Sequence, residues 1–573
     1  MKASDYIVQF LINKGIRDVF GYPGGMVTHF MDSLEKYNNQ ITAHLNYHEQ
    51  ASAMAACAWA EISGKPGVAY ATSGPGATNL ITGICCAYFD SVPCIFITGQ
   101  VNTYEQKGHL QVRQKGFQET DIVAITRTVC KKTYSIKNGV ELIAALNDAY
   151  RVCQEGRPGP VLLDIPMNVL REDVTSSPNA DVAQSHNMES LNSNVEMIIT
   201  HLRNAKRPVI IAGHGIDLSK QRKTFLRMVN VLKIPVVTSM LGVDTIPYEN
   251  PYNFNMIGAY GRRWSNYIVD YSDCILSLGT RLDCRQTGVN RNAFAPNAKI
   301  LRVDIDENEL KNYVHEGQID ICADLKYLIP KILQDVDFTG GEKWFEACKQ
   351  IKSVLLKTDC EPANNFICAL SKYIPSNAVV TSDVGQNQVW TAQSIELQKE
   401  NRLITSGGHG AMGYALPASI GASIASNRMV ICVTGDGGLQ MNLQELETIK
   451  RENLNIKIFV LNNEALGMIH HFQEMYFDGR YMQTQASTGY TTPDFCKIAQ
   501  AYGIETIECT SIEHIKNAMS SPCAILINVK LPTVTHVFPK LGMNKPIHQQ
   551  EPPLNTMKLL EVDQILKEVG AIK

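Results

Sequence analysis

Long apolar runs are missing from the sequence, and no window reaches the ~18 consecutive apolar residues that a membrane span requires. A secretory signal segment is missing too, because Met1-Lys2-Ala3-Ser4-Asp5 leads directly into an amphipathic pattern. There is no long Lys/Arg run, and the formal net charge is only −3, from 53 basic and 56 acidic residues. That balance makes nucleic acid or an acidic membrane surface a poor partner. We therefore expect a cytoplasmic protein that binds small molecules and neither nucleic acid nor membrane.

Closely spaced cysteine pairs are also absent. The 16 cysteines are scattered, often inside apolar runs, and none belongs to a Cys-x-x-Cys motif. This distribution favours buried, reduced thiols over a zinc site or a disulfide framework. A glycine turn, Ser73-Gly74-Pro75-Gly76, follows the apolar run 68–72, yet no Lys-Ser/Thr comes after it. An ATP-binding P-loop is therefore disfavoured.

What the sequence does contain is a regular alternation of short apolar runs and amphipathic segments. This alternation is typical of parallel α/β sheets, and 573 residues are enough for about three or four domains. The polar tract 175–193 predicts a linker, and residues 338–362 predict a second linker or a helical stretch. We expect three α/β domains over 1–174, 190–337 and 363–531, and an irregular tail over 532–573 that ends in a short helix.

Two of the apolar runs end in polar residues that suit a metal ion. Residues 429–433 lead into Gly435-Asp436-Gly437-Gly438, and residues 456–461 lead into Asn462-Asn463. Gly-Asp-Gly alone is more often a surface turn, but adjacent parallel strands would bring Asp436 and Asn463 to the same sheet edge. Such oxygen ligands suit Mg²⁺, which usually completes its shell with phosphate oxygens, and the glycines let backbone N–H groups approach a phosphate. The sequence therefore predicts a site for Mg²⁺ and a diphosphate.

The same spacing carries a family resemblance. Gly-Asp-Gly, a segment with a helix expected over 442–450, and Asn463 at 27 positions after Asp436 resemble the signature of thiamine diphosphate enzymes. The resemblance implies that Asp436 and Asn463 bind Mg²⁺ through their side chains and that the backbone carbonyl of Ala465 is the third protein ligand. Met412, which could otherwise be core filler, would force the cofactor into a bent shape. Cofactor contacts are implied for Gln386, Gly410, Met412, Gly435, Gly437, Gly438 and Met468.

Four motifs near the N-terminus extend this resemblance: Gly21-Tyr22-Pro23-Gly24-Gly25, His48-Glu49-Gln50, Thr72-Ser73-Gly74-Pro75-Gly76-Ala77-Thr78-Asn79 and Gly116-Phe117-Gln118-Glu119. Together they resemble the pyrimidine-binding domain of the acetolactate synthase (acetohydroxyacid synthase) family. A Glu in a first helical turn usually only complements the helix dipole, but the resemblance gives Glu49 a hydrogen bond to the pyrimidine ring of the cofactor. Pro75 and Asn79 would flank that ring, while the reacting centre would be lined by Gly25, Phe117 and Gln118.

A Gly-x-Gly motif, Gly213-His214-Gly215, follows the apolar run 207–212. By itself it is a weak dinucleotide signal, and a structural turn is the default interpretation. The family resemblance implies that this central domain binds FAD, through Arg157 of the preceding domain and through Gly213, Gly258, Arg281, Asp304 and Asp324. The implied fold class is α/β, with three parallel-sheet α/β domains (pyrimidine-binding, central FAD-type and diphosphate-binding), which is the thiamine diphosphate-binding fold.

The activity implied by the resemblance is that of a transferase. It would decarboxylate pyruvate and ligate the two-carbon unit to a carbonyl acceptor, most simply a second 2-oxo acid, in branched-chain amino acid biosynthesis. Arg285 is retained where the family grips the acceptor carboxylate. Because the two halves of the cofactor bind to different subunits in the family, a homodimer or homotetramer with active sites at the subunit interface is implied.

The chain departs from the family pattern at places that matter for substrate choice: Met167 replaces a Lys near the access channel, Phe472 a Trp of the acceptor pocket, and Cys284 an Asp. Asn387 replaces a His near the diphosphate, and the loop 108–115 before Phe117 also differs from the typical one. These variants are similar to thiamine enzymes that join an acetyl unit to a nucleotide-linked keto sugar, so such a sugar is an alternative acceptor. Simple decarboxylation to an aldehyde and flavin-linked oxidation are further alternatives. The intact Glu49, Asp436 and Asn463 argue against a non-catalytic relative.

Overall fold

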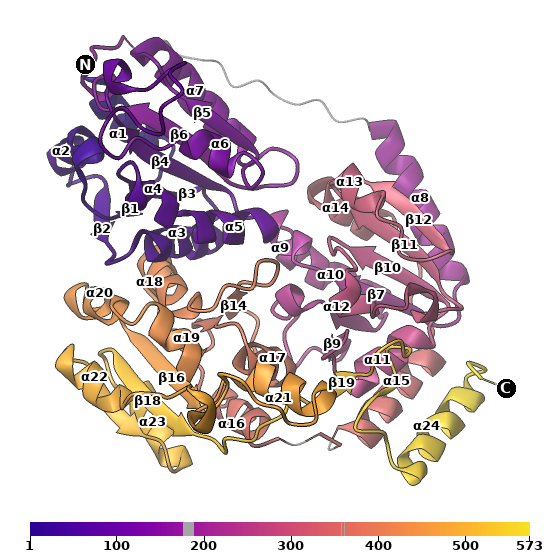
Figure 1. The fold of residues 1–573 in the computed structure, drawn as a ribbon. Helices are drawn as coiled ribbons and strands as arrows, with labels where there is room; N and C mark the ends of the chain where they lie inside the picture. The colour runs from indigo at the N-terminus through magenta and orange to yellow at the C-terminus, as the bar shows by residue number, and fades with distance from the viewer. Residues whose placement is uncertain (176–187, 357, 360, 573) are drawn as a thin grey trace.

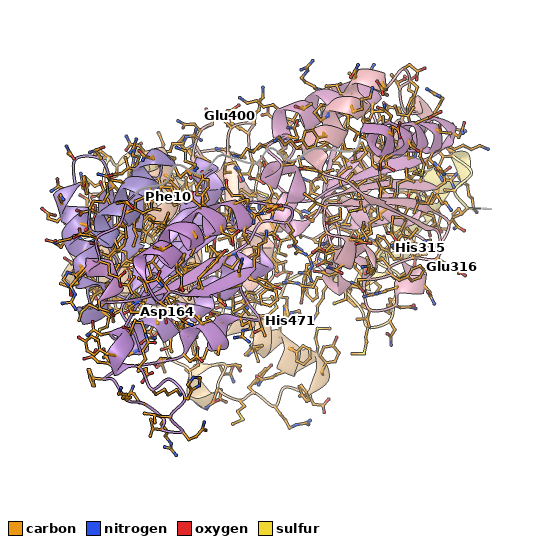
Figure 2. The ribbon with its side chains drawn as sticks, turned by 90° about the horizontal axis from the view of Figure 1, so that it is seen from above. Phe10, Asp164, His315, Glu316, Glu400 and His471 are labelled. Atoms are coloured by element: carbon orange, nitrogen blue, oxygen red, sulfur yellow. The ribbon has the colours of Figure 1, made fainter. Side chains whose placement is uncertain are left out.

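The computed structural model describes residues 1–175, 188–356, 358–359 and 361–572, which fold into three lobes that meet around a common centre (Figure 1). Each lobe contains a six-stranded sheet whose neighbouring strands are parallel. Seen from above, Phe10 and Asp164 mark one end of the molecule, and His315 and Glu316 mark the other (Figure 2). The predicted α/β class with three parallel sheets is confirmed, whereas the domain boundaries stay predictions.

The N-terminal sheet has the strand order β2-β1-β3-β4-β6-β5. Every residue of β3, β4 and β6 is buried, as expected for parallel strands that helices cover on both faces. The strands are β1 Asp18–Gly21, β2 Thr42–Leu45, β3 Gly67–Ala71, β4 Cys94–Gln100, β5 Lys132–Ser135 and β6 Val161–Pro166. The helices are α1 Ala3–Asn13, α2 Thr28–Lys36, α3 Glu49–Ser63, α4 Pro75–Asn79, α5 Ile81–Phe89, α6 Ile122–Thr126 and α7 Gly139–Val152.

The central sheet has the strand order β12-β11-β10-β7-β8-β9. Its inner strands β7 and β10 are again fully buried. The strands are β7 Pro208–Ala212, β8 Val236–Thr238, β9 Asn253–Met256, β10 Cys274–Leu278, β11 Lys299–Asp304 and β12 Gln318–Cys322. The helices are α8 Met188–Asn204, α9 Gly215–Leu218, α10 Arg222–Leu232, α11 Arg263–Asp270, α12 Cys284–Thr287, α13 Glu307–Leu310 and α14 Leu325–Asp335.

The C-terminal sheet has the strand order β14-β13-β15-β16-β18-β17, and β16 is buried along its whole length. Helix α15, Glu342–Leu355, precedes this lobe. The strands are β13 Val379–Ser382, β14 Arg402–Thr405, β15 Val430–Gly435, β16 Ile456–Asn462, β17 Glu505–Glu508 and β18 Ile525–Lys530. The helices are α16 Pro362–Ser371, α17 Gln386–Ser394, α18 Ala415–Ser426, α19 Asp436–Met441, α20 Glu445–Arg451, α21 Gly467–Tyr476, α22 Phe495–Ala501 and α23 Ile512–Ser520.

Three local predictions differ from the structure. The predicted linker 175–193 is wrong at its end, because α8 begins at Met188, while residues 176–187 lie outside the described residues. The helix expected over 442–450 begins only at Glu445. The tail contains a small antiparallel pair, β19 Lys540–Leu541 and β20 Gln550–Glu551, before α24 Thr556–Glu568. It is ordered because Ile547, Val562 and Leu566 join the apolar cluster of the central lobe, a contact that local pattern does not reveal.

The N-terminal and C-terminal lobes pack directly on each other through α3 and α18. Small residues permit the close approach, since a Cβ on Gly421 would overlap the backbone carbonyl of Ala55. Beside this contact, Glu445 accepts hydrogen bonds from the Asn46 side chain at 2.9 Å and the Tyr47 backbone N–H at 2.8 Å. The carboxylate thereby fixes the end of β2 against α20.

The state of the cysteine thiols and the apolar character of the helices both bear on predictions from the sequence. Every cysteine in the part of the chain that the structure describes has a free thiol, and most are buried. Over the same residues, no helix combines the length and the apolar character needed to cross a bilayer. Cytoplasmic location itself stays a prediction.

Candidate active site

Asp436 and Asn463 follow neighbouring strands of the C-terminal sheet. Strands β15 and β16 pair in parallel, and Gly435 lies opposite Leu461, so both polar turns begin at the same carboxyl edge. Asp436 is 3% exposed and Asn463 is 5% exposed. The predicted strand pairing is therefore correct, and it brings a buried carboxylate and a buried amide to one edge.

The Asp436 carboxylate has one occupied and one unoccupied oxygen. Its Oδ1 accepts hydrogen bonds from the Gly437 N–H at 2.6 Å and from the Tyr490 hydroxyl at 2.9 Å. Its Oδ2 is buried and has no hydrogen-bond partner among the described residues. Burial raises the pKa of Asp436 to about 6, and the Tyr490 hydroxyl and the backbone N–H groups of Gly437, Glu464 and Ala465 offset part of this effect. A buried carboxylate oxygen without a partner is costly unless a cation compensates it, so the site fits Mg²⁺.

The Asn463 side chain is oriented by two partners. Its amide nitrogen donates to the Thr535 hydroxyl at 2.8 Å and to Gln386 Oε1 at 3.2 Å. Thr535 is itself fixed, because its hydroxyl donates to Gln386 Oε1 at 2.9 Å and its carbonyl accepts from the Gln386 amide at 2.9 Å. Since an amide oxygen points away from its nitrogen, Oδ1 of Asn463 faces away from this network. Thr535 belongs to the tail, and no local signal in the sequence marks it.

The backbone turn after Asn463 is held by a hydrogen bond to the side chain of the preceding residue, Asn462. Asn462 accepts a hydrogen bond from the Glu464 N–H at 3.1 Å, and Glu464 adopts a left-handed φ of 55°. This turn leads to Ala465, which is 2% exposed and pairs with Gln485 in an isolated bridge. Further along, the Tyr260 hydroxyl of the central lobe donates to the Met468 sulfur at 3.8 Å. The roles of Ala465 and Met468 in binding stay predictions.

Glycines allow side chains to pack closely around the Asp436 turn. A Cβ on Gly437 would lie 2.8 Å from Leu466 Cδ2 and 3.2 Å from both Met412 Cε and the Tyr490 hydroxyl. Gly435 and Gly438 are similarly confined, by the side chains of Asn387 and Asp383. Gly410 has a φ of 70° and open space beside it, with only Val384 Cγ1 within 4 Å. These positions form a cradle that backbone N–H groups can line.

Asp383 connects the predicted Met412 loop to this cradle, although no sequence motif singled it out. Its Oδ1 accepts from the Gly413 N–H at 2.9 Å, and its Oδ2 accepts from the Thr434 hydroxyl at 3.1 Å. Burial raises its pKa to about 6, and these hydrogen bonds counteract part of the rise. Asp383 therefore holds the loop of Met412 against the end of β15.

Glu49 lies in the N-terminal lobe as the first residue of α3, where it is buried. The Asn79 amide donates to Glu49 Oε2 at 3.0 Å. A Cβ on Gly76 would lie 3.0 Å from the other oxygen, Oε1, so the glycine keeps this side of the carboxylate free of protein atoms. The structure thus brings Glu49, Gly76 and Asn79 together and leaves Oε1 available.

The remaining predicted residues of this lobe surround the same glycine turn. A Cβ on Gly74 would lie 2.9 Å from Gln118 Cβ, and Gln118 has a left-handed φ of 64°. Pro75 is exposed at the start of α4, and nothing lies within 4 Å of the Cβ position of Gly25. Phe117 is 79% exposed. Because Phe117 and Pro75 present apolar surface to solvent, this face of the lobe is open in a single chain.

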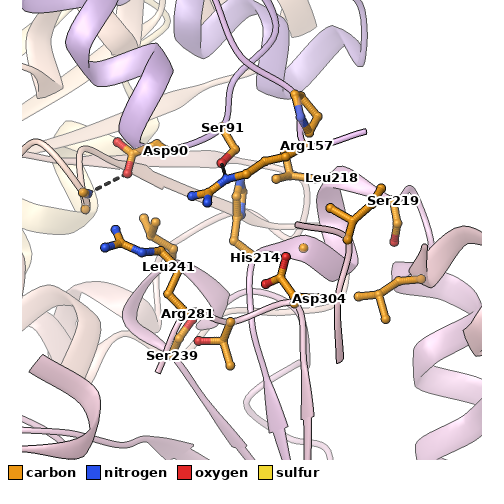
Figure 3. Close-up of a pocket in the computed structure, with 18 of the residues that line it drawn as sticks. Asp90, Ser91, Arg157, His214, Leu218, Ser219, Ser239, Leu241, Arg281 and Asp304 are labelled. Atoms are coloured by element: carbon orange, nitrogen blue, oxygen red, sulfur yellow. Dashed lines mark hydrogen bonds between the residues drawn. The ribbon is translucent and has the colours of Figure 1, made fainter. Parts of the chain in front are cut away.

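A cavity of about 530 Å³ lies where the three lobes meet. Figure 3 shows Arg157, His214, Arg281 and Asp304 around it, and Asp324 and Arg285 also line it. Gly213 and Gly258 do not line the cavity. A Cβ on Gly213 would overlap the Gly279 carbonyl, and one on Gly258 would overlap the Arg285 carbonyl, so these glycines permit close backbone packing behind it.

The groups around this cavity suit a dinucleotide. Arg157 and Arg281 can pair with phosphates, and a strand-end carboxylate such as Asp304 can bind ribose hydroxyls. Part of the positive charge is already compensated, because Glu309 Oε1 lies 2.7 Å from Arg157 Nη1 and 3.4 Å from Arg281 Nε. Burial raises the pKa of Asp304. The residues present therefore fit FAD, and its binding stays a prediction.

Comparison with known proteins gives the same division into three parts. Residues 1–125 match the thiamine pyrophosphate enzyme N-terminal TPP binding domain, 195–334 the central domain, and 383–537 the C-terminal TPP binding domain. The chain is 33% identical over 561 residues to acetolactate synthase isozyme 2 large subunit of Escherichia coli (strain K12), covering 94% of this chain and 97% of that protein. The chain belongs to the acetolactate synthase-like thiamine pyrophosphate enzymes. Thiamine pyrophosphate is another name for thiamine diphosphate, so the predicted family is confirmed.

Other relatives show the same coverage. The acetolactate synthase large subunit of Lactococcus lactis subsp. lactis (strain IL1403) is 35% identical over 553 residues, which cover 94% of each chain. Acetolactate synthase 1, chloroplastic, of Nicotiana tabacum is 34% identical over 566 residues, covering 94% of this chain and 83% of that protein. The similarity therefore extends through all three lobes.

The four single-residue departures from the family pattern have different surroundings. Asn387 is buried and donates to the Asp383 carbonyl at 2.7 Å, which places it under the cradle. Cys284 is exposed at the start of α12, and Phe472 is 46% exposed on α21. Met167 is half-buried just after β6, where its N–H donates to the Gln100 carbonyl at 2.9 Å. Of these four residues, only Asn387 is buried beside the proposed diphosphate site of the C-terminal lobe.

Proposed function

We propose that this enzyme decarboxylates pyruvate and transfers the two-carbon unit to a 2-oxo acid, with thiamine diphosphate and Mg²⁺ as cofactors. Family membership supports thiamine-dependent decarboxylation and carboligation. The observation that carries the proposal is the oriented pair at the edge of the C-terminal sheet. Asp436 Oδ2 is buried without a partner among the described residues, and the nitrogen of Asn463 is fixed by Thr535, so two ligand oxygens remain for a cation.

The chain's own residues have separate tasks in this scheme. When bound, thiamine diphosphate supplies the carbon nucleophile and the electron sink. Asn79 binds Glu49 Oε2, which leaves Oε1 to share a proton with the pyrimidine ring of the cofactor. Asp436 and Asn463 hold Mg²⁺, which anchors the diphosphate. Met412 Cε, beside the glycine cradle, supplies an apolar surface that excludes water from the reacting centre.

A homodimer is part of the proposal. Glu49 and Asp436 belong to different lobes of one chain, and the face around Phe117 and Pro75 is open. A second copy would close that face and pair the pyrimidine half of one subunit with the diphosphate half of another. We also propose that FAD binds in the cavity between the lobes. The proposed pathway is branched-chain amino acid biosynthesis.

Arg285 supports a 2-oxo acid as the acceptor. It lines the cavity near the Tyr260 ring, and its guanidinium can form a bidentate pair with a carboxylate. Product analysis tests this assignment: the holoenzyme receives pyruvate alone, then pyruvate with 2-oxobutyrate, and each product is identified by mass. Acetolactate and acetohydroxybutyrate are the expected products. Release of acetaldehyde or acetate without any carboligation would contradict the proposal.

A second candidate is transfer of the two-carbon unit to a nucleotide-linked keto sugar. The changes at Met167, Cys284 and Phe472 favour it, because they alter residues placed by the resemblance near the substrate. The assay is then repeated with pyruvate and a nucleotide-linked keto sugar. Extension of the sugar, with no acetolactate or acetoin from pyruvate alone, would select this candidate.

A further inference from the structure

Lys540 holds an unusual place in the tail. It begins β19, where the next residue, Leu541, donates its N–H to the Ala259 carbonyl at 2.6 Å. The Leu541 side chain packs toward the central lobe, because its Cδ2 lies 3.0 Å from the Cβ position of Gly288. Side chains of successive strand residues point to opposite sides. Lys540 therefore points away from the central lobe and toward α21.

The Lys540 ammonium group lies against aromatic rings and lacks an acidic partner within the described ranges. Its Nζ lies 5.8 Å from the ring centre of Phe472 and 5.6 Å from that of Tyr476, and 3.3 Å from the Met475 sulfur. Burial lowers its pKa. No carboxylate of the described residues lies within 4 Å of Nζ, and the nearby Glu474 is paired with His536 at 2.9 Å. A half-buried cation is thus left without a counter-charge in this part of the structure.

Tyr260 places Arg285 and Lys540 in one region. Burial raises the pKa of the Tyr260 hydroxyl. The positive charge of Arg285 lowers this pKa, and the nearby Tyr476 raises it. Lys540 lies over the Tyr476 ring, and the Ala259 backbone bonds to both Arg285 and Leu541. Tyr260 and Tyr476 therefore lie between Arg285 in the central lobe and Lys540 in the tail. Phe472 and Tyr476 are 46% and 39% exposed and can contact a ligand.

We propose that Lys540 and Arg285 form an anion-binding subsite for an acceptor that carries a second negative group. Arg285 and Lys540 each take one of the two negative groups of the acceptor, whether these are carboxylates or phosphates. The proposal rests on the proposed function, and it narrows the acceptor from any 2-oxo acid to a doubly charged carbonyl compound. The aromatic rings under Lys540 exclude water on one side and strengthen the pairing.

Steady-state kinetics of the full-length holoenzyme test this subsite. Pyruvate is the donor, and the acceptors are 2-oxobutyrate with one negative charge, 2-oxoglutarate with two carboxylates, and a nucleotide-linked keto sugar with a diphosphate. The last two distinguish a carboxylate from a phosphate as the second group. The variants are Lys540→Met, Lys540→Arg and, as a matched control, Lys545→Met. Lys545 lies close to β19, is 45% exposed and pairs with Glu551 at 2.6 Å.

The wild-type enzyme should prefer one of the doubly charged acceptors. Lys540→Met should raise its KM for that acceptor about tenfold, the size expected for one charge-assisted contact, and leave kcat and the KM for 2-oxobutyrate unchanged. Lys540→Arg should restore most of the loss, and Lys545→Met should match wild type. A preference of the wild-type enzyme for 2-oxobutyrate, an unchanged KM in Lys540→Met, or an equal loss with all acceptors would overturn the subsite.

Calorimetric titration of each acceptor into the holoenzyme measures binding independently of turnover. The dissociation constant of the doubly charged acceptor should rise about tenfold in Lys540→Met, the same factor as for its KM. Equal binding by wild type and this variant would contradict the subsite. A wild-type enzyme that releases no CO₂ from pyruvate contradicts the proposed function instead. The calorimetry still decides the subsite in that case.

Discussion

Replacing Thr535 by valine removes the hydroxyl that orients Asn463. Valine has nearly the same shape, so packing in this 5% exposed position is preserved. The Asn463 amide keeps only Gln386 Oε1, at 3.2 Å, as an acceptor, and Gln386 loses the Thr535 hydroxyl as a donor. Two hydrogen bonds are lost, and the Asn463 amide can turn its nitrogen toward the metal side.

The size of the effect follows from those two bonds. A buried hydrogen bond contributes a net ~1 kcal/mol, and a misdirected metal ligand costs a similar amount again. We therefore expect weaker binding of Mg²⁺ and thiamine diphosphate by about 1.5 to 2 kcal/mol, or roughly 10- to 30-fold in the dissociation constant. Thr535→Ser keeps the hydroxyl and should bind within about twofold of wild type.

Fluorescence provides the assay, because the indole N–H of Trp390 donates to the His536 carbonyl at 3.0 Å, next to Thr535. Titration of Mg²⁺ at fixed thiamine diphosphate gives the dissociation constant for each variant. Thr533→Val is the matched control, since Thr533 is exposed two positions away. Equal Mg²⁺ affinity in Thr535→Val and wild type, with both folded, would refute the orienting role of Thr535.

Four further predictions concern the site and the lobe contacts. Asp436→Ala should lose thiamine diphosphate on dialysis with Mg²⁺ present, and retention of the cofactor would point to another metal site. Burial alone would lower the pKa of His44, yet its contacts with Asp18 and Glu452 raise it from 6.5 to about 8. This contribution to stability is full below pH 6.5 and is lost as the pH rises through 8. The loss should be about 2 kcal/mol, so thermal melting at low and high pH should differ less in His44→Gln than in wild type. Gly76→Ala should lower turnover at least ~10-fold with Mg²⁺ affinity unchanged, because the new methyl group crowds Glu49 Oε1; normal turnover would show that this oxygen is not used. Purified protein should be yellow and release FAD on denaturation, and colourless protein whose activity does not respond to FAD would leave the cavity without a flavin.

The strand ends of the metal site could be predicted from sequence because each depends on local pattern. The apolar runs of β15 and β16 end in glycine or amide residues, and parallel strands at neighbouring positions bring their ends together. Glu49 could be placed at the start of α3 for the same reason, since it follows β2 and begins an alanine-rich run. Its role came from family resemblance and not from its position.

The supporting residues could not be predicted because their contacts are distant in sequence. Thr535 is 72 positions from Asn463, and Tyr490 is 54 positions from Asp436. Nothing in the polar segment around Tyr490 or in the proline-containing tail marks these contacts. The start of α8 was missed because residues 189–194 are polar except for Leu191, which is only partly buried against the core.

Exchange of the hydrogen on thiazolium C2 of bound thiamine diphosphate tests the central claim most directly. NMR follows the loss of deuterium from this carbon in the wild-type protein and in Glu49→Gln, with Mg²⁺ present and without substrate. Glutamine keeps the size and the contact with Asn79 but cannot share a proton as a carboxylate does. We predict rapid exchange in wild type and exchange slower by at least ~100-fold in Glu49→Gln, at equal cofactor occupancy. Equally fast exchange in both proteins would contradict the assignment of Glu49 and the mechanism built on it.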